Sequence, residues 1–146
     1  MEIDPETFEV KIDRFVVAED CGRLINPLIV DGQVHGGVAQ GIGAALYEEI
    51  VHDENGQNVT ASLVDYVVPT AAEIPQLDVI HIESEAASTV GGYRGMGEGG
   101  TIGAPAAIAN AISNALSPLG IGITELPATP ERLFRLVQEA GIDTPD

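Results

Sequence analysis

The chain is poor in basic side chains. Its 146 residues include 6 Lys and Arg against 23 Asp and Glu, which gives a formal charge of −17. Proteins that bind nucleic acid neutralise phosphates with clustered Lys and Arg. Because the basic residues are scattered singly between Lys11 and Arg135, we exclude nucleic acid and anionic membrane surfaces as partners.

Cysteine and long apolar runs are also scarce. The single cysteine, Cys21, cannot form an internal disulfide, which fits a reducing compartment. No segment reaches the roughly 18 consecutive apolar residues of a membrane span, and the acidic start Met1-Glu2-Ile3-Asp4 lacks the features of a signal peptide. We therefore expect a cytoplasmic protein without a membrane span. Apolar residues make up 45% of the chain, enough for one core, so residues 1–146 are predicted to form a single domain.

What the sequence does contain predicts an α+β fold. Charged and apolar residues alternate over 2–4 and 9–17, which indicates an N-terminal β-hairpin around a turn at 4–7. Phe8 stands where such a turn often has a glycine in the left-handed region. Asn26-Pro27 is a typical helix start, and we expect a long helix from there to about Ile50. That helix is rich in glycine, at positions 32, 36, 37, 41 and 43, which predicts a close neighbour.

The second half of the chain predicts further strands and two helices. Residues 59–68 and 77–82 have the composition of partly buried strands. A glycine-rich loop over 86–101 then leads into a helix that we expect to start near Ala104-Pro105 and to stop at 117–120. Thr129-Pro130 opens a last amphipathic helix.

The distribution of charge singles out one carboxylate. Residues 86–120 contain only two charged side chains, Arg94 and Glu98. An isolated carboxylate in an apolar segment is a candidate general base, and the glycines around it would let a large ligand approach the backbone. The alternative is an ordinary loop carboxylate paired with Arg94.

Other patterns are weaker. Gly95-x-Gly97-x-x-Gly100 matches the dinucleotide-binding fingerprint, but it lacks the preceding buried strand and the acidic residue about 20 positions later. Gln40 is a second candidate site residue, because its amide can both donate and accept hydrogen bonds to a heterocycle. Metal ligation by protein side chains is not expected, since the histidines share no metal-ligand spacing with one another or with Cys21. We interpret Cys21 as a core or turn residue.

Four segments, in this order along the chain, resemble one enzyme family. They are Asp20-Cys21-Gly22-Arg23-Leu24-Ile25-Asn26-Pro27, the run from Asp31-Gly32-Gln33-Val34-His35-Gly36-Gly37 through Gln40 to Glu49, Asp65-Tyr66-x-x-Pro69-Thr70, and Gly95-Met96-Gly97-Glu98. Together they resemble the molybdenum hydroxylases: xanthine dehydrogenases, aldehyde oxidoreductases and carbon monoxide dehydrogenase large subunits. The resemblance corresponds to the C-terminal part of the molybdopterin-binding subunit.

The resemblance implies a role for each of these residues. Glu98 would be the catalytic base in the hydroxylation of an aldehyde, N-heterocycle or CO-type carbon with oxygen derived from water. Gln40 would bind the pterin, Gly36 and Gly37 would pack closely around it, and Gly95 to Gly97 would line the cofactor. The implied cofactor is molybdenum-molybdopterin, in its cytosine dinucleotide form. The implied partners are the rest of the large subunit, an FAD subunit and an iron–sulfur subunit.

A non-catalytic hypothesis stands beside this one. The chain would then be an acidic globular fragment, or a self-association module that forms a homodimer, with no cofactor bound. A pterin site closed by several segments buries its ligand poorly when only one wall is present. For the chain alone we expect this inactive state.

Overall fold

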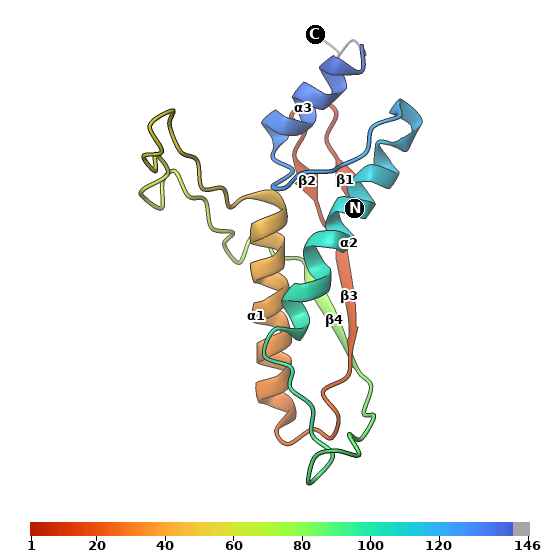
Figure 1. The fold of residues 1–146 in the computed structure, drawn as a ribbon. Helices are drawn as coiled ribbons and strands as arrows, with labels where there is room; N and C mark the ends of the chain where they lie inside the picture. Colours follow the sequence, from red (N-terminus) through yellow and green to blue (C-terminus); the bar gives the residue numbers. More distant parts are fainter. Residues whose placement is uncertain (142–146) are drawn as a thin grey trace.

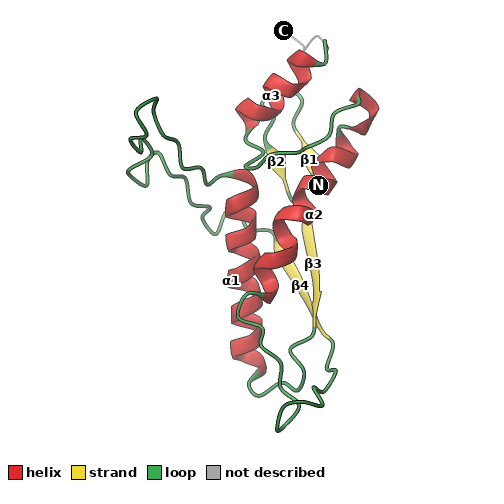
Figure 2. Cartoon of the chain, viewed as in Figure 1, coloured by secondary structure: helices red, strands yellow, loops and turns green. Residues whose placement is uncertain are grey.

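The computed structural model describes residues 1–141, and it confirms the α+β class. Its elements are β1 (Glu2–Ile3), β2 (Val10–Lys11), β3 (Arg14–Glu19), α1 (Pro27–Leu46), β4 (Gln76–His81), α2 (Gly99–Ala115), η1 (Ser117–Leu119) and α3 (Pro130–Glu139). Figures 1 and 2 show α1 and α2 side by side next to the paired strands β3 and β4, with α3 near β1 and β2. Within residues 1–141, no helix combines the length and the apolar character needed to cross a membrane.

The N-terminal hairpin is present, but its second strand is divided. β1 pairs antiparallel with β2, and β3 continues into a parallel pair with β4. The parallel register places Arg14 beside Gln76 and Glu19 beside His81. Phe8 has a φ of 59° and is buried, with its ring centroid 5.5 Å from that of Phe134. Packing against α3 accompanies the left-handed backbone at this position.

Helix α1 begins as expected and ends earlier. The Asn26 side chain accepts a hydrogen bond from the Ile29 N–H, which caps the start. The end lies at Leu46 rather than near Ile50, because the Gly43 carbonyl accepts both the Tyr47 and the Glu48 N–H and closes the last turn.

One strand prediction is wrong. Residues 59–68 form turns and irregular structure, inside a long connection over 47–75 that projects from the molecule (Figure 1). Leu63 and Val64 are exposed to solvent there. Within the described part of the chain no strand pairs with this segment, and an extended segment gains little without a partner for its backbone.

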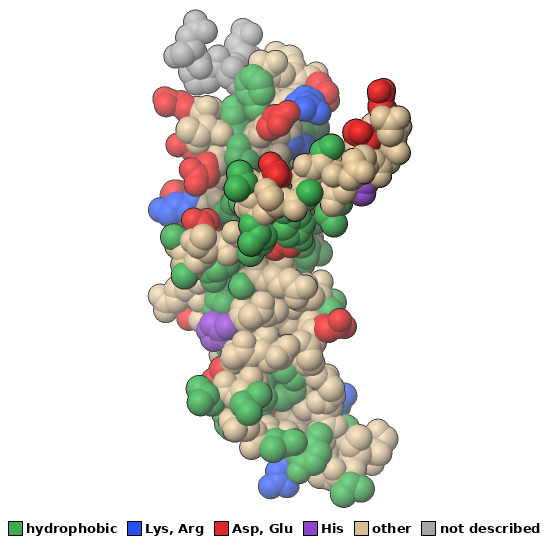
Figure 3. Space-filling view, turned by 90° about the vertical axis from the view of Figure 1, so that its left-hand side faces the viewer, with side chains coloured by type: hydrophobic (Ala, Val, Ile, Leu, Met, Phe, Trp, Pro, Cys, Tyr) green, Lys and Arg blue, Asp and Glu red, His purple; other side chains and the backbone are tan. Residues whose placement is uncertain are grey.

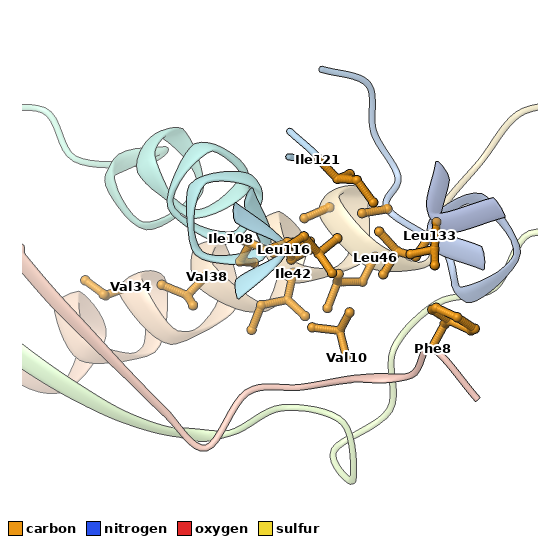
Figure 4. Packing of buried hydrophobic residues seen from close by; sticks show 14 residues of the cluster. Phe8, Val10, Val34, Val38, Ile42, Leu46, Ile108, Leu116, Ile121 and Leu133 are labelled. Atoms are coloured by element: carbon orange, nitrogen blue, oxygen red, sulfur yellow. The ribbon is translucent and has the colours of Figure 1, made fainter. Parts of the chain in front are cut away.

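The core lies between α1, α2, α3 and the N-terminal strands. The largest fully buried side chains are Ile42, Ile108, Ile112 and Leu133, together with Val34 and Val38. Figure 4 shows that these and neighbouring apolar side chains form one continuous cluster along α1. Helical spacing predicts inward positions at Ile108, Ile112, Leu116, Leu133, Leu136, Val137 and Ala140. All of these are buried or partly buried except Ala140, which is exposed at the end of α3, so the prediction is wrong there.

Candidate functional site

Glu98 lies at the junction of the glycine-rich loop and α2. The helix begins at Gly99, five residues before the expected start, which makes Glu98 its N-cap residue. Its side chain is exposed and lines a groove of about 460 Å³ formed by Glu19, Asp20, Gly95 to Gly99 and Ile102. The carboxylate is therefore accessible to a ligand at the positive end of a helix.

The loop before Glu98 is held by hydrogen bonds and an ion pair to α1 and to the segments at residues 20–21 and 84. Gln33 of α1 donates from Nε2 to the Gly97 carbonyl at 2.6 Å. The Arg94 N–H donates to the Cys21 carbonyl at 2.8 Å. The Arg94 Nε donates to the Ser84 carbonyl and lies 3.5 Å from Asp20 Oδ2. Arg94 thus pairs with Asp20, and the alternative in which it pairs with Glu98 is wrong.

Gln40 lies on the face of α1 next to the start of α2. It is exposed, and its Oε1 is 3.5 Å from the Thr101 hydroxyl, which donates to the Gly37 carbonyl at 2.7 Å. Thr101 is three residues after Glu98. The structure therefore brings the glutamine-bearing helix and the Glu98 junction together, although 58 residues separate the two side chains in sequence.

The four predicted glycines differ in their surroundings. A Cβ on Gly37 would lie 3.0 Å from the Gly100 Cα and from the Thr101 N, so this glycine permits close packing of α1 on α2. A Cβ on Gly36, Gly95 or Gly97 would meet no atom of another segment within 4 Å in the part of the chain that the structure describes. Gly37 is thus an interhelix contact, while the other three leave open backbone around Gln40 and Glu98.

Two weaker sequence hypotheses can also be assessed. β4 ends at His81, well before Gly95, so the Gly95-x-Gly97-x-x-Gly100 motif does not follow a strand directly, as a dinucleotide fingerprint would. Cys21 is buried, and burial raises the pKa of its thiol, with the Glu19 charge as a further cause. It is a core residue, as interpreted from the sequence. In residues 1–141 no group of three or more His, Cys, Asp or Glu could hold a metal ion.

Sequence reasoning missed a cluster beneath the loop. His81 on β4 lies with Nδ1 3.1 Å from Glu19 Oε1 of β3 and with Nε2 2.7 Å from Asp31 Oδ1 of α1. These residues are separated by 62 and 50 positions. Only the parallel pairing of β3 with β4 places Glu19 beside His81, and this pairing has no local signal in the sequence.

Comparison with known proteins identifies the family. Residues 1–75 match the profile of the molybdopterin cofactor-binding domain. The nicotine 6-hydroxylase large subunit of Paenarthrobacter nicotinovorans is 48% identical over 92% of this chain and 16% of its own length. The carbon monoxide dehydrogenase large chain of Afipia carboxidovorans is 34% identical over 97% of this chain and 18% of its own. Quinoline 2-oxidoreductase from Pseudomonas putida 86 superposes with a TM-score of 0.91, at 45% identity, over 94% of this chain and 17% of that one.

The chain thus spans about a sixth of the length of the curated relatives it matches. Its identity to them exceeds 30% over nearly all of its residues, and its fold superposes closely on a solved relative. The chain belongs to the molybdenum-binding large subunits of the xanthine dehydrogenase, carbon monoxide dehydrogenase and aldehyde oxidoreductase family.

Proposed function

We propose that residues 1–146 are the C-terminal portion of a molybdopterin-binding domain and form one wall of its active site. The reaction is the hydroxylation of an aldehyde, N-heterocycle or CO-type carbon with oxygen derived from water. The observation that carries the proposal is the position of Glu98: an accessible carboxylate in a groove, with open glycine backbone on one side and the Gln40-bearing helix next to it.

The residues in this groove and on the neighbouring helix fit a pterin cofactor: Gly95 and Gly97 line the groove, and Gly36 and Gln40 belong to α1. Open backbone at Gly36, Gly95 and Gly97 leaves room for a flat heterocycle, because no side chain within residues 1–141 occupies the space that a Cβ would fill. The exposed amide of Gln40 can donate to and accept from such a ring. When bound, the molybdenum cofactor supplies the acceptor for two electrons. We propose the cytosine dinucleotide form of the cofactor.

Glu98 would act as the general base. Its carboxylate oxygen takes a proton from the water-derived oxygen that attacks the substrate carbon, and the acid then returns that proton to solvent. Its exposed place in the groove lets the side chain approach the reacting groups. The hydrogen bond from Gln33 to the Gly97 carbonyl holds the loop immediately before it.

Other subunits and segments complete the enzyme in this proposal. The partners are the remainder of the large subunit, an FAD subunit and an iron–sulfur subunit; one relative is itself named as subunit gamma of a dehydrogenase complex.

Figure 3 shows hydrophobic side chains on the surface at the lower end of the molecule. Exposed Ile25, Leu28 and Ile29 lie around the start of α1. An apolar surface of this kind favours contact with another protein segment.

The same surface supports the second candidate function, a chain that self-associates as a homodimer and holds no cofactor by itself. We expect this state for the isolated 146 residues, because the groove at Glu98 is open to solvent and would leave much of a bound cofactor exposed. Molybdenum analysis of the purified chain beside the complete subunit tests this. Metal in the complete subunit alone is the expected result, and metal in both would contradict it.

The function itself is tested by Glu98→Gln in the complete enzyme. The amide keeps the size of the side chain and cannot accept the proton, so we expect turnover to fall by at least about a hundredfold with molybdenum content unchanged. Glu54→Gln, in the projecting connection, is the matched control and should retain full turnover. Full turnover in Glu98→Gln would refute the assignment.

A further inference from the structure

His81 joins three elements beneath the glycine-rich loop. It belongs to β4, and its two ring nitrogens face carboxylates on β3 and α1 at 3.1 and 2.7 Å. The His81 side chain is 19% exposed, that of Glu19 is 7% exposed and that of Asp31 is 45% exposed. Only the imidazolium form has an N–H on both nitrogens, so only this form donates to both carboxylates at once.

Glu19 extends this network to the start of α2. Its Oε1 faces His81, whereas its Oε2 is buried and has no hydrogen-bond partner among the described residues. A Cβ on Gly99, the residue next to Glu98, would lie only 3.0 Å from this Oε2. The free oxygen therefore lies against the first residue of α2. The Gly99 N–H already donates to the Met96 carbonyl and the Thr101 N–H to the Glu98 carbonyl, so what favours the Glu19 carboxylate here is the positive end of the helix.

We propose that His81, acting through Glu19, is a positioning residue for Glu98: it orients the Glu19 carboxylate against the first turn of α2 and so sets the place of the helix start that carries Glu98. This inference rests on the proposed function, because it takes Glu98 as the base. Glu19 and Glu98 line the same groove. A shift of the Glu19 carboxylate would therefore change the position of the helix start next to it and, with it, that of Glu98.

The charged groups that face His81 all stabilise its protonated form. They are Glu19 from β3 and Asp31 from α1. On the side of α2, the nearest charged side chain is Glu98, just before the helix. Within residues 1–141 no basic residue forms an ion pair with Glu19 or Asp31 apart from His81 itself. The hydrogen bond with Asp31 raises the pKa of His81 above its usual value, against the effect of burial. The protonated His81 therefore holds both Glu19 and Asp31 at low pH. It loses one of these hydrogen bonds as pH rises through the pKa of His81 in the folded protein.

Two measurements on the molybdenum-loaded holoenzyme test the proposal. The first is turnover against pH with a substrate that does not titrate, in which loss of the His81 proton gives the falling limb at high pH. The second is amide hydrogen exchange by mass spectrometry, corrected for intrinsic pH dependence, on peptides that cover 94–102. A peptide from α3 (Pro130–Glu139) is the internal control. His81→Gln and Glu19→Gln are the variants, and His52→Gln in the exposed connection is the matched control.

We expect His81→Gln to lower turnover about tenfold, to remove the falling limb and to raise exchange in 94–102 at neutral pH, with molybdenum content unchanged. Glu19→Gln should do the same, and the double variant should be no worse than either single one. In the wild type, exchange in 94–102 should rise over the pH range of the falling limb, a result that needs no variant to fold.

The two proposals fail in different ways. The positioning role alone would be overturned if the corrected exchange rate of 94–102 did not change with pH. It would also be overturned if turnover of His81→Gln still fell at high pH. Unchanged turnover in Glu98→Gln would overturn the proposed function, whatever the exchange of 94–102 shows.

Discussion

Two glycine-rich regions meet at the site, and their glycines differ in what surrounds them. In the interface of α1 with α2, Gly37, Gly41 and Gly100 each stand where a Cβ would lie within about 3 Å of another atom. In the loop before α2, Gly95 and Gly97 have nothing within 4 Å of that position. The first set brings two helices into backbone contact. The second leaves a surface on which, in our proposal, a cofactor rests.

Glycine content alone does not distinguish a packed helix contact from an open surface. Gly36 and Gly37 are neighbours in sequence on one helix, yet Gly36 points into open space and Gly37 touches Gly100. A helix turns by about 100° per residue, so adjacent positions face different surroundings. Adding a single methyl group at chosen glycines tests which of them are packed and which are open.

The largest effect is expected at Gly100. A Cβ there would lie 2.5 Å from the Val34 carbonyl oxygen, which is backbone and cannot rotate away. We expect Gly100→Ala to lower the free energy of unfolding by about 3 kcal/mol, measured by urea denaturation of the chain. Gly103→Ala in the same helix has open space around it and should be at least as stable as the wild type. Equal stability of both variants would mean that the helices do not touch at Gly100.

The neighbouring pair on α1 should give effects of opposite sign. Gly36→Ala adds a helix-favouring residue in open space and should stabilise the chain by about 1 kcal/mol. Gly37→Ala gains the same propensity but forces apart the backbones at Gly100 and Thr101. We expect a net loss of about 1 kcal/mol. The same denaturation measurement compares the two, and a shared sign would contradict the assigned faces.

The smallest effect on stability is expected in the loop. Gly95→Ala should change the free energy of unfolding by less than about 0.5 kcal/mol, because a Cβ there meets no atom of the described residues within 4 Å. In the complete enzyme the same methyl group should lower molybdenum content, since the proposed cofactor lies against this backbone. Normal molybdenum content in Gly95→Ala would argue against a cofactor surface at this glycine.

Local chemistry made several elements predictable. Asn26 and Thr129 cap the helices that follow them, as their positions before proline predict. Alternation predicted the hairpin, and helical spacing predicted the buried faces of α2 and α3. Segments whose structure depends on distant partners were less predictable. The apolar residues of 59–68 have the composition of a strand, but within residues 1–141 they meet no partner strand.

For the candidate site, the isolation of Glu98 within 86–120 was visible in the sequence, as was the unusual setting of Gln40. Their proximity was not visible, because it depends on the packing of Gly37 against Gly100 and on the Thr101 hydroxyl between the two helices. The Glu19–His81–Asp31 cluster had no sequence signal at all. Each of its members is common, and the spacing between them reflects no local period.

Local sequence patterns indicate which side chains are candidates for chemistry and where α1 and α3 begin, because capping, alternation and isolated charge depend on near neighbours. Three features come from tertiary contacts instead: α2 starts at Gly99 directly after Glu98, one glycine of a neighbouring pair is packed while the other is open, and His81 lies between two carboxylates. Those features depend on contacts between segments 50 or more residues apart, and such contacts form only when the chain is folded.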